Sequence, residues 1–82
     1  MPYESETRII QLVVKELANI RNANKLSKNA LSEMTGLSRR SIQFIEEGKR
    51  SPTLLSLLKI AHAMDLDLGK IITKEDAKMT KG

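Results

Sequence analysis

Two glycines and the serine between them place the strongest constraint on the fold of this chain. Gly36 and Gly48 each stand where an amphipathic pattern stops, and glycine most readily takes the left-handed conformation that ends a helix. Only Leu37 separates Gly36 from Ser38, a residue type whose hydroxyl accepts hydrogen bonds from the free amides at a helix start. The stretch therefore predicts a short helix over residues 39–47 that leaves the preceding helix at a steep angle.

Apolar residues at three- and four-residue spacings predict two helices before this short one. The first runs from about Thr7 to Ala23, and the same spacing makes one of its sides apolar. The second begins at Lys28, after Ser27 as its cap, and Gly36 ends it.

The chain after Gly48 predicts two more helices and a tail. Thr53 caps a fourth helix, and Asp67 starts a short fifth one. We expect these helices to carry the apolar positions Leu54, Leu57, Leu58, Ala61, Met64, Leu68, Ile71 and Ile72. The last ten residues, TKEDAKMTKG, have no sustained apolar period, so we expect one domain over residues 1–73 and a flexible tail over residues 74–82. Because no segment alternates with a period of two, the predicted fold class is all-α with five helices.

Composition argues against several classes of protein. A chain of 82 residues without cysteine has neither disulfides nor thiolate metal sites, and its one histidine, His62, cannot hold a metal ion alone. No apolar run approaches the roughly 20 residues of a membrane span, and the first residues do not resemble a signal peptide, so we expect a cytoplasmic protein. The small core leaves little room for a cofactor or a small-molecule substrate, and no motif sets a nucleophile beside a base, so we expect no enzyme.

Positive charge gathers between residues 25 and 50. Six basic residues stand there against three acidic ones, which gives +3 of the net charge of +4. These are Lys25, Lys28, Arg39, Arg40, Lys49 and Arg50 against Glu33, Glu46 and Glu47. Such a cluster indicates an anionic partner, nucleic acid or a membrane surface, and a merely solvated charged face is the alternative.

Two short helices joined by a tight glycine turn are typical of a helix-turn-helix. If Leu31, Ile42 and Ile45 face inward, helical rotation places Arg39, Arg40, Gln43 and Phe44 on the outer side of the third helix. An α-helix fits the major groove of DNA, where arginine reads guanine, glutamine reads adenine and an apolar ring touches a thymine methyl group. For Phe44 a place in the core stays open as the alternative.

Other polar residues stand where phosphates of a bound duplex would run. Lys28 lies at the positive end of the second helix, and Lys49, Arg50 and Ser51 follow the third helix. Each such contact raises affinity without reading sequence, so salt should weaken binding steeply.

From Ile9 to Ile72 the chain resembles the Cro/C1-type, or XRE, family of phage-repressor-like helix-turn-helix domains. The resemblance rests on Arg21 with a short link to Leu26-Ser27, and on three ordered stretches, LSEMTGLS, SRRSIQFIEEGKRSP and KIAHAMDLDLGKI. It implies a five-helix lambda-repressor-like domain that regulates transcription as a repressor and binds a palindromic operator as a homodimer. It further implies DNA contacts at or near Lys28, Ser38, Arg39, Arg40, Gln43 and Phe44, and an ion pair between Arg21 and Glu46 that orients the third helix.

Four positions depart from the family pattern. Lys28 stands where glutamine is common, Met34 where a polar residue is usual, and Thr35 where an aliphatic one is usual. Leu55 stands where a charged residue is more frequent, and it suggests a surface for a second subunit, together with Leu66, Leu68, Ile72 and Tyr3. A protein-interaction module, such as an antitoxin or adaptor that keeps the fold with DNA binding secondary, is the alternative function.

Overall fold

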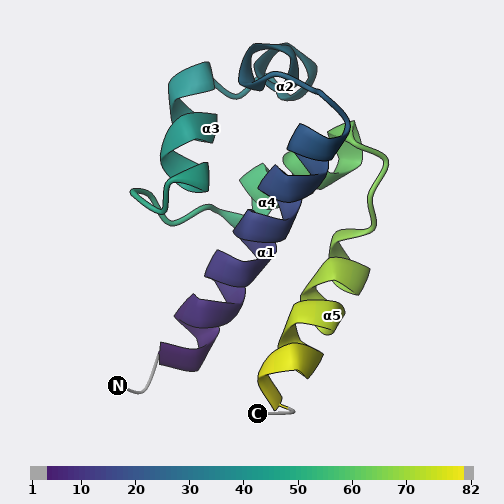
Figure 1. Cartoon of the computed structure of the whole chain (residues 1–82). Coiled ribbons are helices and arrows are strands. Elements are labelled where there is room, and N and C mark those ends of the chain that lie inside the picture. Colours follow the sequence, from purple (N-terminus) through teal and green to yellow (C-terminus); the bar gives the residue numbers. More distant parts are fainter. Residues whose placement is uncertain (1–3, 81–82) are drawn as a thin grey trace.

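The computed structural model describes residues 4–80, and its five elements are all helices (Figure 1). They are α1 (Glu4–Ala23), α2 (Lys28–Thr35), α3 (Arg39–Glu46), α4 (Leu54–Ala63) and α5 (Leu68–Thr80). The all-α fold with a helix-turn-helix at α2 and α3 is thereby confirmed. None of these helices is long and apolar enough to cross a membrane.

The helix ends follow the local chemistry. Ser27, Ser38 and Thr53 each accept a hydrogen bond from the amide three residues later, as N-caps do. Gly36 and Gly48 have φ angles of 77° and 74°, in the left-handed region where only glycine is unstrained. α1 begins earlier than expected, at Glu4, and its first turn holds Glu4 and Glu6, whose charges favour a helix start.

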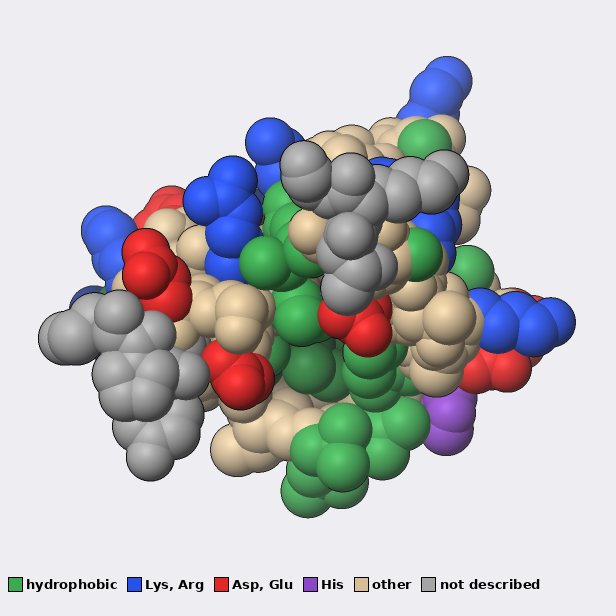
Figure 2. Space-filling model, turned by 90° about the horizontal axis from the view of Figure 1, so that it is seen from below, with side chains coloured by type: hydrophobic (Ala, Val, Ile, Leu, Met, Phe, Trp, Pro, Cys, Tyr) green, Lys and Arg blue, Asp and Glu red, His purple; other side chains and the backbone are tan. Residues whose placement is uncertain are grey.

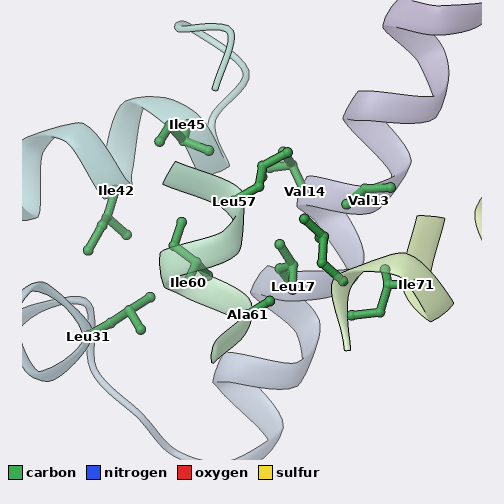
Figure 3. Packing of buried hydrophobic residues seen from close by; sticks show 11 residues of the cluster. Val13, Val14, Leu17, Leu31, Ile42, Ile45, Leu57, Ile60, Ala61 and Ile71 are labelled. Atoms are coloured by element: carbon green, nitrogen blue, oxygen red, sulfur yellow. The ribbon is translucent and has the colours of Figure 1, made fainter. Parts of the chain in front are cut away.

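All five helices contribute aliphatic side chains to one core. In Figure 3, Leu31 of α2 and Ile42 of α3 point toward Ile60 of α4, with α1 and α5 on the other side. The full set of buried apolar residues is Val13, Val14, Leu17, Leu31, Ile42, Ile45, Leu57, Ile60, Ala61, Leu68 and Ile71. Because Ile42 and Ile45 both belong to this core, the opposite side of α3 is left to face outward.

Two expectations about buried residues are wrong. Leu54 was expected on the buried side of α4, but it is 64% exposed, because it is the first residue of the helix and no neighbouring helix covers it. Ile60 is buried in its place among the apolar positions of α4. Leu68, which we placed on a surface for a second subunit, is in the core, and Tyr3 lies outside the described residues.

The expected flexible tail is helical over residues 74–80. α5 continues to Thr80 and runs beside α1 (Figure 1). Lys74 donates a 3.1 Å hydrogen bond to Glu16 of α1, and Glu75 is only 3% exposed, with Lys78 at 3.4 Å. Packing on α1 supplies the stability that the weak apolar period of TKEDAKMT does not.

Candidate nucleic-acid interface

Hydrogen bonds from side chains fix the turn between α2 and α3. The hydroxyl of Ser32 donates to the Leu37 carbonyl at 2.6 Å, across the turn. The hydroxyl of Thr35 donates to the Leu31 carbonyl at 2.8 Å and accepts from the Leu37 amide at 3.1 Å. Thr35, unusual for this position, therefore satisfies polar backbone groups at the turn, which an aliphatic side chain would not do.

An ion pair holds the end of α3 against α1. Arg21 Nε and Nη2 donate to the two carboxylate oxygens of Glu46 at 2.7 and 2.9 Å, and Nη1 donates to the Leu26 carbonyl at 2.8 Å. The arginine is 7% exposed, so its guanidinium is desolvated and its three bonds replace water. The pair joins the two residues that the family resemblance implied, and it fixes how far α3 is rotated relative to α1.

On the outer side of α3, one arginine of the helix and one of the following loop lie next to the ring of Phe44. The Arg40 guanidinium carbon lies 5.5 Å from the ring centroid, and that of Arg50 lies 5.6 Å from it. Arg39, Arg40 and Arg50 are exposed, whereas Phe44 is half-buried. Phe44 is absent from the buried core and instead takes part in two cation–π contacts on the surface.

Ser41 links the start of α3 to the loop that follows it. Ser38, the N-cap, accepts from the Ser41 amide and donates its hydroxyl to Ser41 Oγ at 2.9 Å. Arg50 Nη1 also donates to Ser41 Oγ, at 3.0 Å. Sequence reasoning missed Ser41, although its place three residues after the cap was a usable signal. It ties the Arg50 side chain to the same side of α3 as Arg40.

A second glutamate, Glu47, lies among these basic groups. Gln43 Nε2 donates to Glu47 Oε2 at 3.1 Å, and Lys49 Nζ is 3.4 Å from the other carboxylate oxygen. The hydrogen bond from Gln43 is the main cause that lowers the pKa of Glu47, and the charges of Lys49 and Lys28 lower it further. Sequence reasoning also missed Glu47. Its carboxylate accepts a hydrogen bond from the side-chain amide of Gln43, so this amide is already bonded within the protein.

The residues predicted to meet phosphates lie at the two borders of α3. Ser38 is exposed at its start, and Lys49, Arg50 and Ser51 are exposed in the loop after its end. Lys28 is half-buried in the first turn of α2, and its positive charge helps to lower the pKa of Glu47. Among the predicted contact residues, the structure joins Ser38, Arg40, Phe44 and Arg50 through direct contacts or through Ser41, and it joins Gln43 and Lys49 through Glu47.

Comparison with known proteins supports the helix-turn-helix. A family model described as helix-turn-helix matches residues 17–71. The control protein C.SmaI of Serratia marcescens is 31% identical over 74 residues, which cover 90% of this chain and 88% of that protein. The uncharacterised HTH-type transcriptional regulator y4dL of Sinorhizobium fredii is 38% identical over 56 residues, which cover 68% of this chain and 29% of that protein. No solved structure matches.

Proposed function

We propose that this chain, which belongs to the Cro/C1-type family of helix-turn-helix DNA-binding transcriptional regulators, acts as a homodimeric repressor on a palindromic operator. In this proposal α3 enters the major groove of each half-site. The protein uses no cofactor, binds no small-molecule substrate and catalyses no reaction. The observation that carries the proposal is the outer side of α3, where exposed arginines, Gln43 and the ring of Phe44 share one surface while Ile42 and Ile45 are buried behind them.

The residues of this surface divide into two roles. Arg39, Arg40, Gln43 and Phe44 lie on α3 itself, where side chains reach base edges once a helix is in the groove. Phosphate contacts, which position the protein without reading bases, are assigned to Lys28, Ser38, Lys49, Arg50 and Ser51. The side-chain amide of Gln43 must leave Glu47 before it can read a base, so part of its binding energy is lost in that exchange.

Direct binding assays test the proposal. We expect the chain to bind duplexes selected from a random library, and Arg40→Ala to lower the affinity by about 1–3 kcal/mol and relax base preference at one position. Lys49→Ala should weaken binding evenly across sequences and reduce the salt slope by about one. Lys70→Ala on α5, which lies on the far side of α1 from α3 in Figure 1, is the matched control for loss of one charge. Absence of duplex binding at low salt would favour the protein-interaction alternative.

Two neighbouring leucines support the dimer. Leu54 and Leu55 are 64% and 63% exposed at the start of α4. Figure 2 shows that hydrophobic side chains gather at the lower edge of the surface that it displays. A pair of adjacent leucines in water is a candidate contact for another subunit. Because α4 directly follows the loop after α3, a contact through its start would hold two α3 helices near each other.

The oligomeric state tests this surface. We expect sedimentation to give a dimer and Leu55→Asp to give a monomer that still folds, because Leu55 takes no part in the core. Met34→Asp on α2 makes the same change at another exposed hydrophobic residue and should leave the dimer intact. Footprinting should then show two protected half-sites with centres ~34 Å apart on one side of the duplex. A monomeric wild-type protein, or a single half-site, would contradict the dimer.

A further inference from the structure

Arg40, Phe44 and Arg50 form one assembled group before any DNA is bound. The guanidinium carbons of the two arginines lie 5.5 and 5.6 Å from the same ring centroid. Arg40 and Phe44 are one helical turn apart, and Arg50 is fixed a second time by its bond to Ser41. Contacts made in advance reduce the side-chain entropy that is lost on binding, so this group is suited to recognise a ligand as a unit.

The spacing within the group indicates what it can recognise together. An arginine that reads a guanine places its guanidinium level with that base pair, at the O6 and N7 atoms. The ring centroid is 5.5 Å away, and successive bases are roughly 3.4 Å apart, so this distance is long enough for the ring to reach the neighbouring base pair. An aromatic ring offers that pair no strong hydrogen bond. The apolar group in the major groove that it can contact is the C5-methyl group of a pyrimidine.

We propose that Arg40 and Phe44 read a two-base step, a guanine next to a pyrimidine that carries a C5-methyl group. Arg40 donates to the guanine, Phe44 covers the methyl group, and Arg50 keeps its contact with the same ring. This inference rests on the proposed function, since it requires α3 in the major groove. The methyl group belongs either to thymine or to 5-methylcytosine, which present it at the same position of the base.

Removal of single methyl groups from DNA tests the inference without changing any base pair. The probe is the duplex selected by the wild-type protein, in which each thymine in turn is replaced by deoxyuridine. One methyl group is worth about 0.8 kcal/mol, so at a thymine next to a guanine we expect the wild-type affinity to fall about fourfold. Phe44→Ala should show no such loss at that position, and the control Lys70→Ala should show the full loss.

Two further arms identify the source of the methyl group and the role of Arg40. A cytosine placed at the same position and then methylated at C5 should regain about the same factor in wild type and nothing in Phe44→Ala. A 7-deazaguanine next to it removes the N7 acceptor, and it should weaken wild type but not Arg40→Ala. Gain with 5-methylcytosine and no loss at any thymine would assign the site to methylated DNA.

The inference falls if wild type and Phe44→Ala respond equally to every methyl removal and every C5 methylation. It also falls if the methyl group that affects affinity belongs to a pyrimidine without a neighbouring guanine. Either result leaves duplex binding itself intact, whereas failure of the proposed function would appear as no binding by wild type. If circular dichroism shows that Phe44→Ala is unfolded, Phe44→Leu takes its place. We then expect deoxyuridine to lower the affinity of Phe44→Leu less than that of wild type. An equal loss in the two proteins overturns the inference.

Discussion

The two sides of α3 hold the same kinds of residue in opposite surroundings. Glu46 and Glu47 are neighbours in sequence, but Glu46 accepts hydrogen bonds from two nitrogens of a buried arginine on α1, whereas Glu47 is exposed and pairs with Gln43 and Lys49. The inner side is fixed by another helix, and the contacts described on the outer side come from α3 and the loop after it. Changes on the inner side should therefore alter the fold, and changes on the outer side should alter binding alone.

The largest expected difference between the two sides is at the glutamates. Glu46→Ala leaves the Arg21 guanidinium buried without its carboxylate, so we expect the free energy of unfolding to fall by about 3–5 kcal/mol. Glu47→Ala removes only surface contacts and should leave it nearly unchanged. Urea denaturation of the two variants measures both values. Similar losses in both would mean that the ion pair does not distinguish the two sides.

An intermediate effect on stability is expected at Ser38, which lies at the border between the two sides of α3. Ser38→Ala removes the N-cap of α3 and should lower the free energy of unfolding by about 1 kcal/mol. Ser38→Asp keeps a capping oxygen and should leave stability near that of wild type. Its carboxylate would face DNA phosphates, so its duplex affinity should fall more than that of Ser38→Ala. Thermal denaturation and a binding titration of both variants separate the roles, and an unchanged affinity in Ser38→Asp would remove Ser38 from the DNA contacts.

The smallest expected effect is on the charge of Glu47. Because Gln43 stabilises the ionised carboxylate, the pKa of Glu47 is lower in the folded chain than in the unfolded one. The stabilisation is complete above the unfolded pKa and is lost as the pH falls through the folded pKa. Gln43→Ala should raise the pKa of Glu47 toward its ordinary value while the thermal midpoint at neutral pH changes little. Carboxyl NMR titration of both proteins checks this, and an unmoved pKa would rule out Gln43 as the main cause.

The ends of the short helices were predictable because they depend on neighbouring residues alone. Gly36, Ser38 and Gly48 act through hydrogen bonds and φ angles within one turn, so their roles are visible in the order of the letters. The buried side of α3, which carries Ile42 and Ile45, was also predictable, because the helical period fixes which residues share one side of the helix.

Contacts between distant residues were harder to predict. The sequence did not predict the helical course of residues 74–80 or the exposure of Leu54, because a short apolar pattern does not show which other helix will cover a segment. Ser41 gained its Arg50 partner through the course of the loop after α3, and Phe44 stayed undecided for the same reason.

The amino-acid order by itself determined the helix boundaries around the turn and the concentration of basic side chains near it. Only the tertiary structure decided that α5 continues along α1, that two leucines at the start of α4 stay in water, and that arginines from a helix and a loop meet on one ring. The physical reason is range. Caps and turns form within four or five residues of chain, whereas burial and side-chain pairing depend on surfaces that meet only after the helices have packed.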